Sequence, residues 1–172
     1  MPIRDATPDD APAMAAIYAH HVLHGTGTFE EQPPAAEEMA ARLARIGAAG
    51  HAWIVVEEEG TILGYGYFNN FHPRSAYRHT AEDSIYVRDD VRGQGVGKAL
   101  VAELLRRAEA AGFRQMVAVI GDSENVGSIG LHLSLGFRQA GTLKAVGLKF
   151  GRWVDVVYMQ KALGEGERTL AG

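Results

Sequence analysis

A short stretch of glycines between basic residues constrains this chain more than any other feature. Residues 89–101 read DDVRGQGVGKALV, with three glycines at alternate positions from Gly93, Arg92 before them and Lys98 after them. A β-prone run, SIYV, ends just before the stretch, and apolar residues at helical spacing follow it. A glycine turn from a strand into a helix lets backbone N–H groups converge on an anion at the positive helix end. The stretch therefore predicts an anion-binding turn, with an ordinary tight turn as the alternative.

Two widespread phosphate-binding motifs do not fit the stretch. A P-loop, G-x-x-x-x-G-K-[ST], would need a glycine and a hydroxyl where the chain has Arg92 and Ala99. A dinucleotide fingerprint, G-x-G-x-x-G, fails because Lys98 or Leu100 stands where its third glycine belongs. The pattern [Q/R]-x-x-G-x-[G/A] is met from Arg92 to Gly97. The anion is thus expected to belong to neither a nucleoside triphosphate nor a dinucleotide.

Composition narrows the class of protein. The 172 residues, 47% apolar and 22% charged, suit one globular domain, and the net charge of −4 argues against generic nucleic-acid binding. The absence of cysteine excludes disulfides, thiolate metal sites and cysteine nucleophiles. The start, MPIRDATPDD, lacks the apolar stretch of a signal peptide, and no run of 18 apolar residues occurs. We expect a soluble cytoplasmic protein without a membrane partner.

Periodicity predicts an α/β protein whose sheet has mixed direction. Residues 1–163 are expected to form a single domain, and the glycine-rich, polar residues 164–172 a flexible tail. Strands are expected at 3–6, 51–60, 61–71, 81–87, 115–121, 139–150 and 153–163, and helices at 7–23, 35–50, 96–111 and 123–137.

Five segments together resemble the GCN5-related N-acetyltransferases (GNAT), in their phosphinothricin and methionine sulfone/sulfoximine N-acetyltransferase branch. They read GTGTFEEQPP, AYRHTAEDSIYV, RGQGVGKAL, AVIGDSENVGSIGLHLSLGF and VGLKFGRWVDVVYMQ, and they span residues 25–160. The resemblance implies a mostly antiparallel sheet of about six to seven strands flanked by about four helices. It also implies a homodimer that transfers acetyl from acetyl-CoA to the α-amine of a small amino acid or analogue.

The resemblance assigns the anion to the pyrophosphate of acetyl-CoA. It implies that a second segment, about 30 residues on, and the strand before the glycines also line the cofactor. The expected cofactor residues are Ile85, Tyr86, Val87, Arg92, Gly93, Gln94, Gly95, Val96, Gly97, Lys98, Asn125 and Ser128. Asn125 and Ser128 also suit the start of a helix.

Acetyl transfer to an amine needs a base for the amine proton, and Glu82 is the expected one, directly or through water. It matches the family glutamate in T-x-E-x-S-[I/V]-Y-V, and a carboxylate beside a partly buried cleft can have a raised pKa. Asp83 is adjacent, but strand alternation sends the two side chains to opposite faces. The alternative is an ordinary strand carboxylate.

His132 stands where many relatives in the wider superfamily carry a tyrosine as the candidate acid for the leaving thiolate. Imidazole can donate or relay a proton, so we expect His132 near the thiol as that acid. The alternative is a histidine packed on its helix with local hydrogen bonds. Because the chain has no cysteine, transfer is expected to be direct, in a ternary complex.

The acceptor residues are weakly marked. A carboxylate-bearing substrate favours a bidentate arginine, which Arg74 or Arg78 can supply, and Phe29 can form an apolar wall. Each is also ordinary for a loop. His20 and His24 have a zinc-compatible spacing but no recognised third ligand, so we expect no metal. The functional alternatives are another amine acceptor (polyamine, aminoglycoside or protein terminus) and a non-catalytic acyl-CoA sensor.

Overall fold

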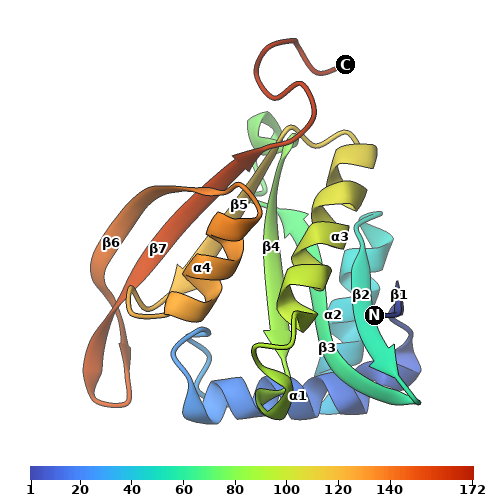
Figure 1. The fold of residues 1–172 in the computed structure, drawn as a ribbon, viewed down its shortest axis with the longest axis vertical. Helices are drawn as coiled ribbons and strands as arrows, with labels where there is room; N and C mark the ends of the chain where they lie inside the picture. The colour runs from blue at the N-terminus through green and yellow to red at the C-terminus, as the bar shows by residue number, and fades with distance from the viewer.

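A seven-stranded sheet with helices on both faces makes up the computed structural model, which describes residues 1–172 (Figure 1). The strand order is β1-β2-β3-β4-β5-β7-β6, and all neighbours are antiparallel except β4 and β5. The strands are β1 Ile3–Asp5, β2 Trp53–Glu58, β3 Thr61–Asn70, β4 Thr80–Val87, β5 Gln115–Gly121, β6 Arg138–Lys149 and β7 Arg152–Ala162. The helices are α1 Ala11–His24, α2 Ala36–Ala48, α3 Val96–Ala110 and α4 Val126–Ser134, with 3-10 turns η1 Pro8–Asp10, η2 Ser75–Tyr77 and η3 Asp89–Val91.

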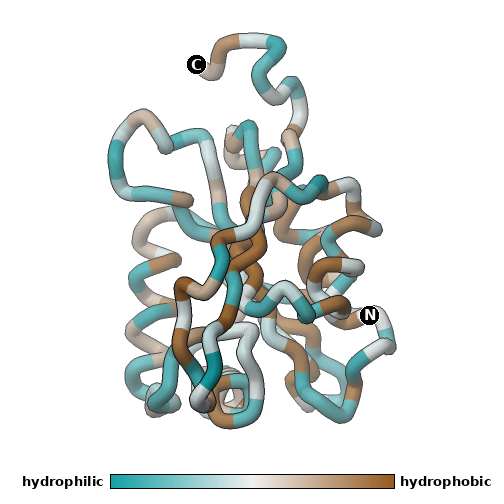
Figure 2. The backbone as a smooth tube through the Cα atoms, turned by 90° about the vertical axis from the view of Figure 1, so that its left-hand side faces the viewer, coloured by the Kyte–Doolittle hydropathy of each residue, from teal (hydrophilic) through white to brown (hydrophobic).

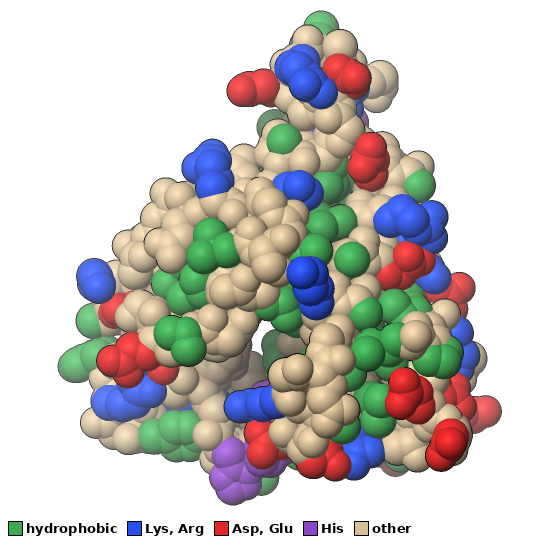
Figure 3. All heavy atoms as spheres, viewed as in Figure 1, with side chains coloured by type: hydrophobic (Ala, Val, Ile, Leu, Met, Phe, Trp, Pro, Cys, Tyr) green, Lys and Arg blue, Asp and Glu red, His purple; other side chains and the backbone are tan.

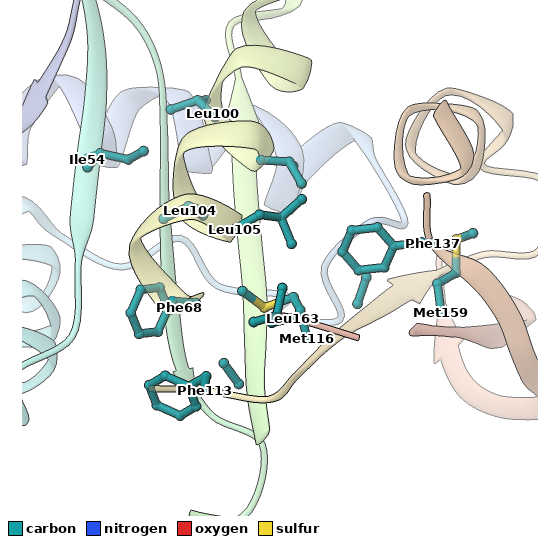
Figure 4. Packing of buried hydrophobic residues seen from close by; sticks show 14 of the residues in the cluster. Ile54, Phe68, Leu100, Leu104, Leu105, Phe113, Met116, Phe137, Met159 and Leu163 are labelled. Carbon is teal, nitrogen blue, oxygen red and sulfur yellow. The ribbon is translucent and has the colours of Figure 1, made fainter. Parts of the chain in front are cut away.

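The helices divide the core into two layers. On β2, Ile54 and Val56 face the α3 side, whereas Trp53 and Val55 face α1 and α2, so this strand is buried on both faces. Figure 4 shows the α3 layer, where Leu100 and other apolar side chains of α3 pack on the sheet. Along the backbone, the apolar segments lie inside the sheet and the polar ones at its turns (Figure 2).

The two central strands, β4 and β5, separate about halfway along their length. The parallel pairing of β4 with β5 ends at Asp83 opposite Ala118, although β4 continues to Val87 and β5 to Gly121. Beyond Asp83, β4 is still paired with β3 along one edge. Its other edge, which faces β5, has no strand partner there. This separation opens the sheet between the N-terminus of α3 and α4.

The β6–β7 hairpin projects from the edge of the sheet (Figure 1, left). Its register shifts between Leu143 and Gly147, where Ala145 has a positive φ of 54°. Asp155 stabilises this bulge by accepting hydrogen bonds from the Ala145 N–H at 2.9 Å and the Ser123 hydroxyl at 2.8 Å. The hairpin is therefore an arm with a defined bulge rather than a regular extension of the sheet.

The predicted element order and mixed, mostly antiparallel sheet are confirmed, with two differences at helix ends. The first helix was expected from residue 7, but η1 precedes α1, because Asp10 accepts hydrogen bonds from the Thr7 N–H and from both Arg4 nitrogens. The helix expected at 123–137 is limited to α4. At the C-terminus, Arg114 donates to the Gly166 carbonyl at 2.7 Å, and the flexibility of 164–172 stays a prediction. No helix is long and apolar enough to cross a bilayer.

Candidate active site

A cleft of about 730 Å³ occupies the opening between β4 and β5. Its walls come from the end of α1 and the loop after it, the second half of β4, the glycine loop with α3, the end of β5, and α4. Figure 3 shows the surface hollowed between the N-terminal end of α3 and α4. The separation of two strands thus brings five distant segments to one site.

The glycine loop, Arg92–Lys98, is shaped by its three glycines for two different reasons. Gly93 and Gly95 have φ values of +75° and +87°, which other residues rarely adopt. Gly97 has ordinary helical geometry, but a Cβ there would lie 2.7 Å from Leu131 of α4. The loop therefore turns sharply into α3 and holds α4 against it.

The first turn of α3 supplies backbone donors to the cleft. Its intrahelical ladder begins with the Ala99 N–H bonded to the Gly95 carbonyl at 3.0 Å, so the preceding N–H groups have no helical partner. Arg92 and Lys98 are exposed at the cleft, and Arg92 also pairs with Asp89 at 3.0 Å. This end can hold a polyanion. Val96 is buried beneath it, and Gln94 is exposed away from the cleft lining.

The second half of β4 forms one wall of the cleft. Ile85, Tyr86 and Val87 line it with backbone that β5 does not pair. The Val87 carbonyl is bonded to His21 Nε2 at 2.8 Å, which ties α1 to the end of the strand. A carbonyl can only accept, so His21 Nε2 carries the hydrogen of this bond; burial lowers the pKa of the ring. Backbone groups of residues 84–86 remain available to a ligand laid along the strand.

Glu82 is half-buried on β4, just before the strands separate. Burial, together with the charge of Asp83, raises its pKa to about 7. It lies on the strand face of Ser84, which lines the cleft, while Glu82 itself does not. A carboxylate with this pKa can accept a proton near neutrality.

His132 lies on the opposite face of β4, buried at the base of the cleft. Its Nε2 is 2.8 Å from Asp83 Oδ2 and its Nδ1 is 2.8 Å from the Ser128 carbonyl. Both ring nitrogens are therefore engaged. Burial acts to lower the pKa of His132, but the bonds to Asp83 and Ser128 outweigh it and raise the pKa. Sequence reasoning missed the Asp83–His132 pair, although the alternation of β4 pointed Asp83 away from Glu82.

The start of α4 contributes two predicted residues. Asn125 is the N-cap, and its Oδ1 accepts the Ser128 N–H at 3.2 Å. Both residues also line the cleft. The capping role and a cofactor contact are compatible, because the Asn125 amide keeps its N–H donors.

Phe29 lies in the 25–31 loop after α1, whose residues Gly25–Gly27 line the cleft. Its ring is packed against the backbone of Gly121 and Gly147, leaving no room for a Cβ at Gly147. The ring therefore packs against glycines on two separate strands. Phe29 is 38% exposed, and it does not line the cleft.

Polar contacts that the sequence did not reveal hold the 25–31 loop. Asp122, strained at φ 79°, accepts the Thr26 hydroxyl at 2.7 Å and Arg152 Nη2 at 2.8 Å, which lower its pKa to about 2. Lys149, although buried, donates to the Thr28 carbonyl at 2.8 Å. These residues join β5, β6 and β7 to the loop. The one signal was the turn DSEN after β5, and it marks Asp122 alone.

A second set of contacts ties the loop to α1 and α2. The Tyr18 hydroxyl contacts the Thr28 hydroxyl at 2.8 Å and donates to Glu30. Arg42 binds both Glu30 oxygens, at 2.9 and 2.7 Å. The loop is therefore held from both sides of the sheet.

Arg74 and Arg78 flank η2, immediately before β4, and both are exposed. Neither lines the cleft, and Arg78 donates to the Ser75 carbonyl at 3.0 Å. They do lie near the end of β4 that carries Glu82. The ring centres of His20 and His24 lie 5.0 Å apart with the rings tilted, and no group of three or more metal-binding side chains occurs.

Comparison with known proteins places this arrangement in a family. A model described as an acetyltransferase (GNAT) domain matches residues 3–158. The chain is 52% identical over 168 residues to phosphinothricin N-acetyltransferase of Alcaligenes faecalis, covering 98% of this chain and 85% of that protein. It is 41% identical to the L-methionine sulfoximine/L-methionine sulfone acetyltransferase of Pseudomonas aeruginosa, over 92% of each.

A solved structure agrees with the sequence matches. The phosphinothricin acetyltransferase of Sinorhizobium meliloti, a GNAT superfamily protein in complex with AcCoA, superposes with a TM-score of 0.96 and 45% identity, covering 99% of this chain and 92% of that one. The predicted fold and family are thereby confirmed. With its glycine loop, separated central strands and half-buried glutamate, this chain belongs to the GNAT family of acetyltransferases.

Proposed function

We propose that this enzyme transfers the acetyl group of acetyl-CoA to the α-amine of a small amino-acid analogue of the phosphinothricin or methionine sulfoximine type. The observation that carries the proposal is the 52% identity to a phosphinothricin N-acetyltransferase over nearly the whole chain, together with the intact cleft. The AcCoA complex of the relative from Sinorhizobium meliloti supports acetyl-CoA as the co-substrate.

The glycine loop is proposed to bind the pyrophosphate of acetyl-CoA. The unpaired N–H groups at the start of α3 and the charges of Arg92 and Lys98 support this role. The backbone of residues 85–87 is proposed to bind the pantetheine arm as an added strand would, with Asn125 and Ser128 on the facing wall. The cofactor would thus be fixed mainly by backbone groups.

Glu82 is proposed as the base. An amine attacks only when neutral, and a carboxylate of pKa about 7 can take its proton at physiological pH. The nitrogen forms its bond to the acetyl carbon as the bond from carbon to sulfur breaks. An unpaired N–H of β4 is proposed to stabilise the oxyanion, and His132 to assist the departing thiolate.

The acceptor is proposed to bind between Phe29 and the start of β4. Phe29 supplies an apolar wall, and the exposed Arg74 or Arg78 supplies the partner of the substrate carboxylate. Support for the arginines is their position next to the end of β4 that carries Glu82.

The test is thiol release from acetyl-CoA with phosphinothricin, methionine sulfoximine, methionine sulfone, polyamines and short peptides as acceptors. We expect turnover with at least one of the first three. Turnover only with a polyamine or peptide would reject this acceptor class, and turnover with none would favour an acyl-CoA sensor.

A homodimer is also proposed, and the β6–β7 arm supports it. Five large apolar side chains of this arm are 48–66% exposed: Leu143, Val146, Leu148, Phe150 and Trp153. Exposed apolar groups gathered on one arm are typical of a protein interface. Sedimentation should give the mass of a dimer, and Trp153→Glu should shift it towards the monomer; a wild-type monomer at all concentrations would reject the dimer. A cytoplasmic location without nucleic-acid or membrane partners stays a prediction.

A further inference from the structure

The pair formed by Asp83 and His132 has a fixed proton arrangement. The Ser128 carbonyl, 2.8 Å from Nδ1, can only accept, so Nδ1 carries a hydrogen. Nε2 then faces Asp83 Oδ2 at 2.8 Å, and two bare acceptors would repel each other at that distance. One proton must therefore lie between the ring and the carboxylate. Because a carboxyl group is ordinarily far more acidic than an imidazolium, this proton belongs on the ring.

The surroundings of the pair shield both side chains from solvent. The side chains of His132 and Asp83 are 3% and 2% exposed. Phe137, labelled in Figure 4, packs its edge against the imidazole with ring centres 4.8 Å apart. A buried imidazolium is stable only with its partner charge in place, and Asp83 is the one carboxylate bonded to it.

The pair also lies at the point of the fold where β4 and β5 separate. Asp83 is the last β4 residue paired with β5, opposite Ala118, so the pair stands where the cleft begins. Both side chains line that cleft. His132 is fixed to α4 through Ser128 and to β4 through Asp83, and the ring cannot turn without breaking a bond.

We propose that Asp83 is a positioning residue for acetyl transfer: it holds His132 as a doubly protonated imidazolium whose positive charge stabilises the departing thiolate. This inference rests on the proposed function. In it, the amine proton goes to Glu82, the thiolate later takes a proton from solvent, and the imidazolium keeps both of its protons. His132 thus acts as a fixed cation and not as the proton donor that its sequence position suggests.

The charged groups around the ring make this assignment specific. The bond from Asp83 opposes the effect of burial and raises the pKa of His132. No other residue of α4 is titratable. The remaining titratable groups at the cleft are His21, His24, Tyr86, Arg92, Lys98, Asp122 and Glu124, and none of them is hydrogen-bonded to His132.

The first test is the protonation state of His132, measured from the ¹⁵N shifts of its ring nitrogens in the whole protein at pH 7.5. The signal is assigned by its loss in His132→Gln. We expect both nitrogens to be protonated in the wild type, and Nε2 to lose its proton in Asp83→Asn. A neutral ring in the wild type, or an unchanged ring in Asp83→Asn, would overturn the inference. The result of this measurement does not depend on which amine the enzyme acetylates, or on whether it acetylates any amine.

The second test is kinetic. Removing the carboxylate lowers the pKa of the ring, so the imidazolium is lost at a lower pH. Asp83→Asn should therefore reduce kcat by about tenfold or more, shift the alkaline limb of its pH profile to lower pH, and leave the KM for acetyl-CoA within about twofold. Asp83→Glu should recover part of kcat, which a purely structural role does not require.

A matched control removes a carboxylate–cation pair away from the cleft. Glu103 on α3 binds Arg106 and Arg107, and Glu103→Gln should leave kcat and its pH profile unchanged. If the wild type turns over and Asp83→Asn matches it at every pH, the positioning role is wrong while the proposed function stands. If Asp83→Asn does not fold, the ¹⁵N shifts of the wild type still decide the matter.

Discussion

The two ends of the cleft are built in different ways. The glycine loop is a continuous stretch whose shape follows from Gly93, Gly95 and Gly97, and it offers backbone N–H groups. The 25–31 loop owes its position to side chains from four separate segments: Tyr18 on α1, Arg42 on α2, Asp122 after β5 and Lys149 on β6. The proposed site of the constant pyrophosphate is thus built from backbone, and the proposed site of the variable amine is positioned by replaceable side chains.

This difference in how the two ends are built has a functional consequence. Backbone donors do not depend on the identity of the side chains, so the proposed pyrophosphate site can stay the same whatever the acceptor. The hydroxyl, carboxylate and lysine that hold Phe29 can each be exchanged, which would move its ring by fractions of an ångström. Such shifts are enough to change which amine is held in attack geometry.

Glu82, between the two ends, should give the largest effect. Glu82→Gln removes the base, and we expect kcat to fall by about 10²- to 10⁴-fold with acetyl-CoA affinity unchanged. The pKa of Glu82 is raised to about 7, so wild-type activity should fall as the pH drops through 7 and Glu82 becomes protonated. That acid limb should be absent in Glu82→Gln. Wild-type rates at every pH from this variant would remove Glu82 as the base.

Gly95→Ala breaks the glycine-loop end. An alanine held at φ +87° costs about 1–2 kcal/mol, so we expect acetyl-CoA to bind about tenfold more weakly, with the amine KM little changed. Titration calorimetry measures the affinity. Gly47→Ala is the control, since Gly47 lies on α2 with open space around it and alanine there should stabilise the fold by about 0.5–1 kcal/mol. Equal acetyl-CoA affinity in both variants would contradict the role of the loop geometry.

Thr26→Val loosens the other end and should have the smallest effect. It deletes the donor to Asp122 while keeping the shape of the side chain. Asp122 keeps its bonds to Arg152 and the Glu124 N–H, so only part of the roughly 1.5–3 kcal/mol of a bond to a charged group is lost from amine binding. We expect the KM of the amine to rise severalfold, with acetyl-CoA affinity unchanged. Thr142→Val, on the exposed part of β6, is the matched control for the substitution itself. An unchanged amine KM would show that the Thr26 contact does not position the loop.

The same difference explains what the sequence could predict. The sheet, the helices and the turn at the glycine loop depend on local periodicity and on residues with restricted geometry. Their positions were confirmed apart from helix ends, whereas anion binding by the loop stays a proposal. The roles of Glu82 and the cofactor residues rested on resemblance and stay proposals. Asp83, Asp122 and Lys149 escaped prediction because their partners are 49, 96 and 121 residues away in the chain.

Bisubstrate kinetics of the double variant Gly95→Ala/Thr26→Val test the central claim, that the two ends act separately, most directly. The account predicts that the KM for acetyl-CoA matches that of Gly95→Ala, that the KM for the amine matches that of Thr26→Val, and that the free-energy changes add to within about 0.5 kcal/mol. A double variant in which either KM departs from its single-variant value by tenfold would contradict it.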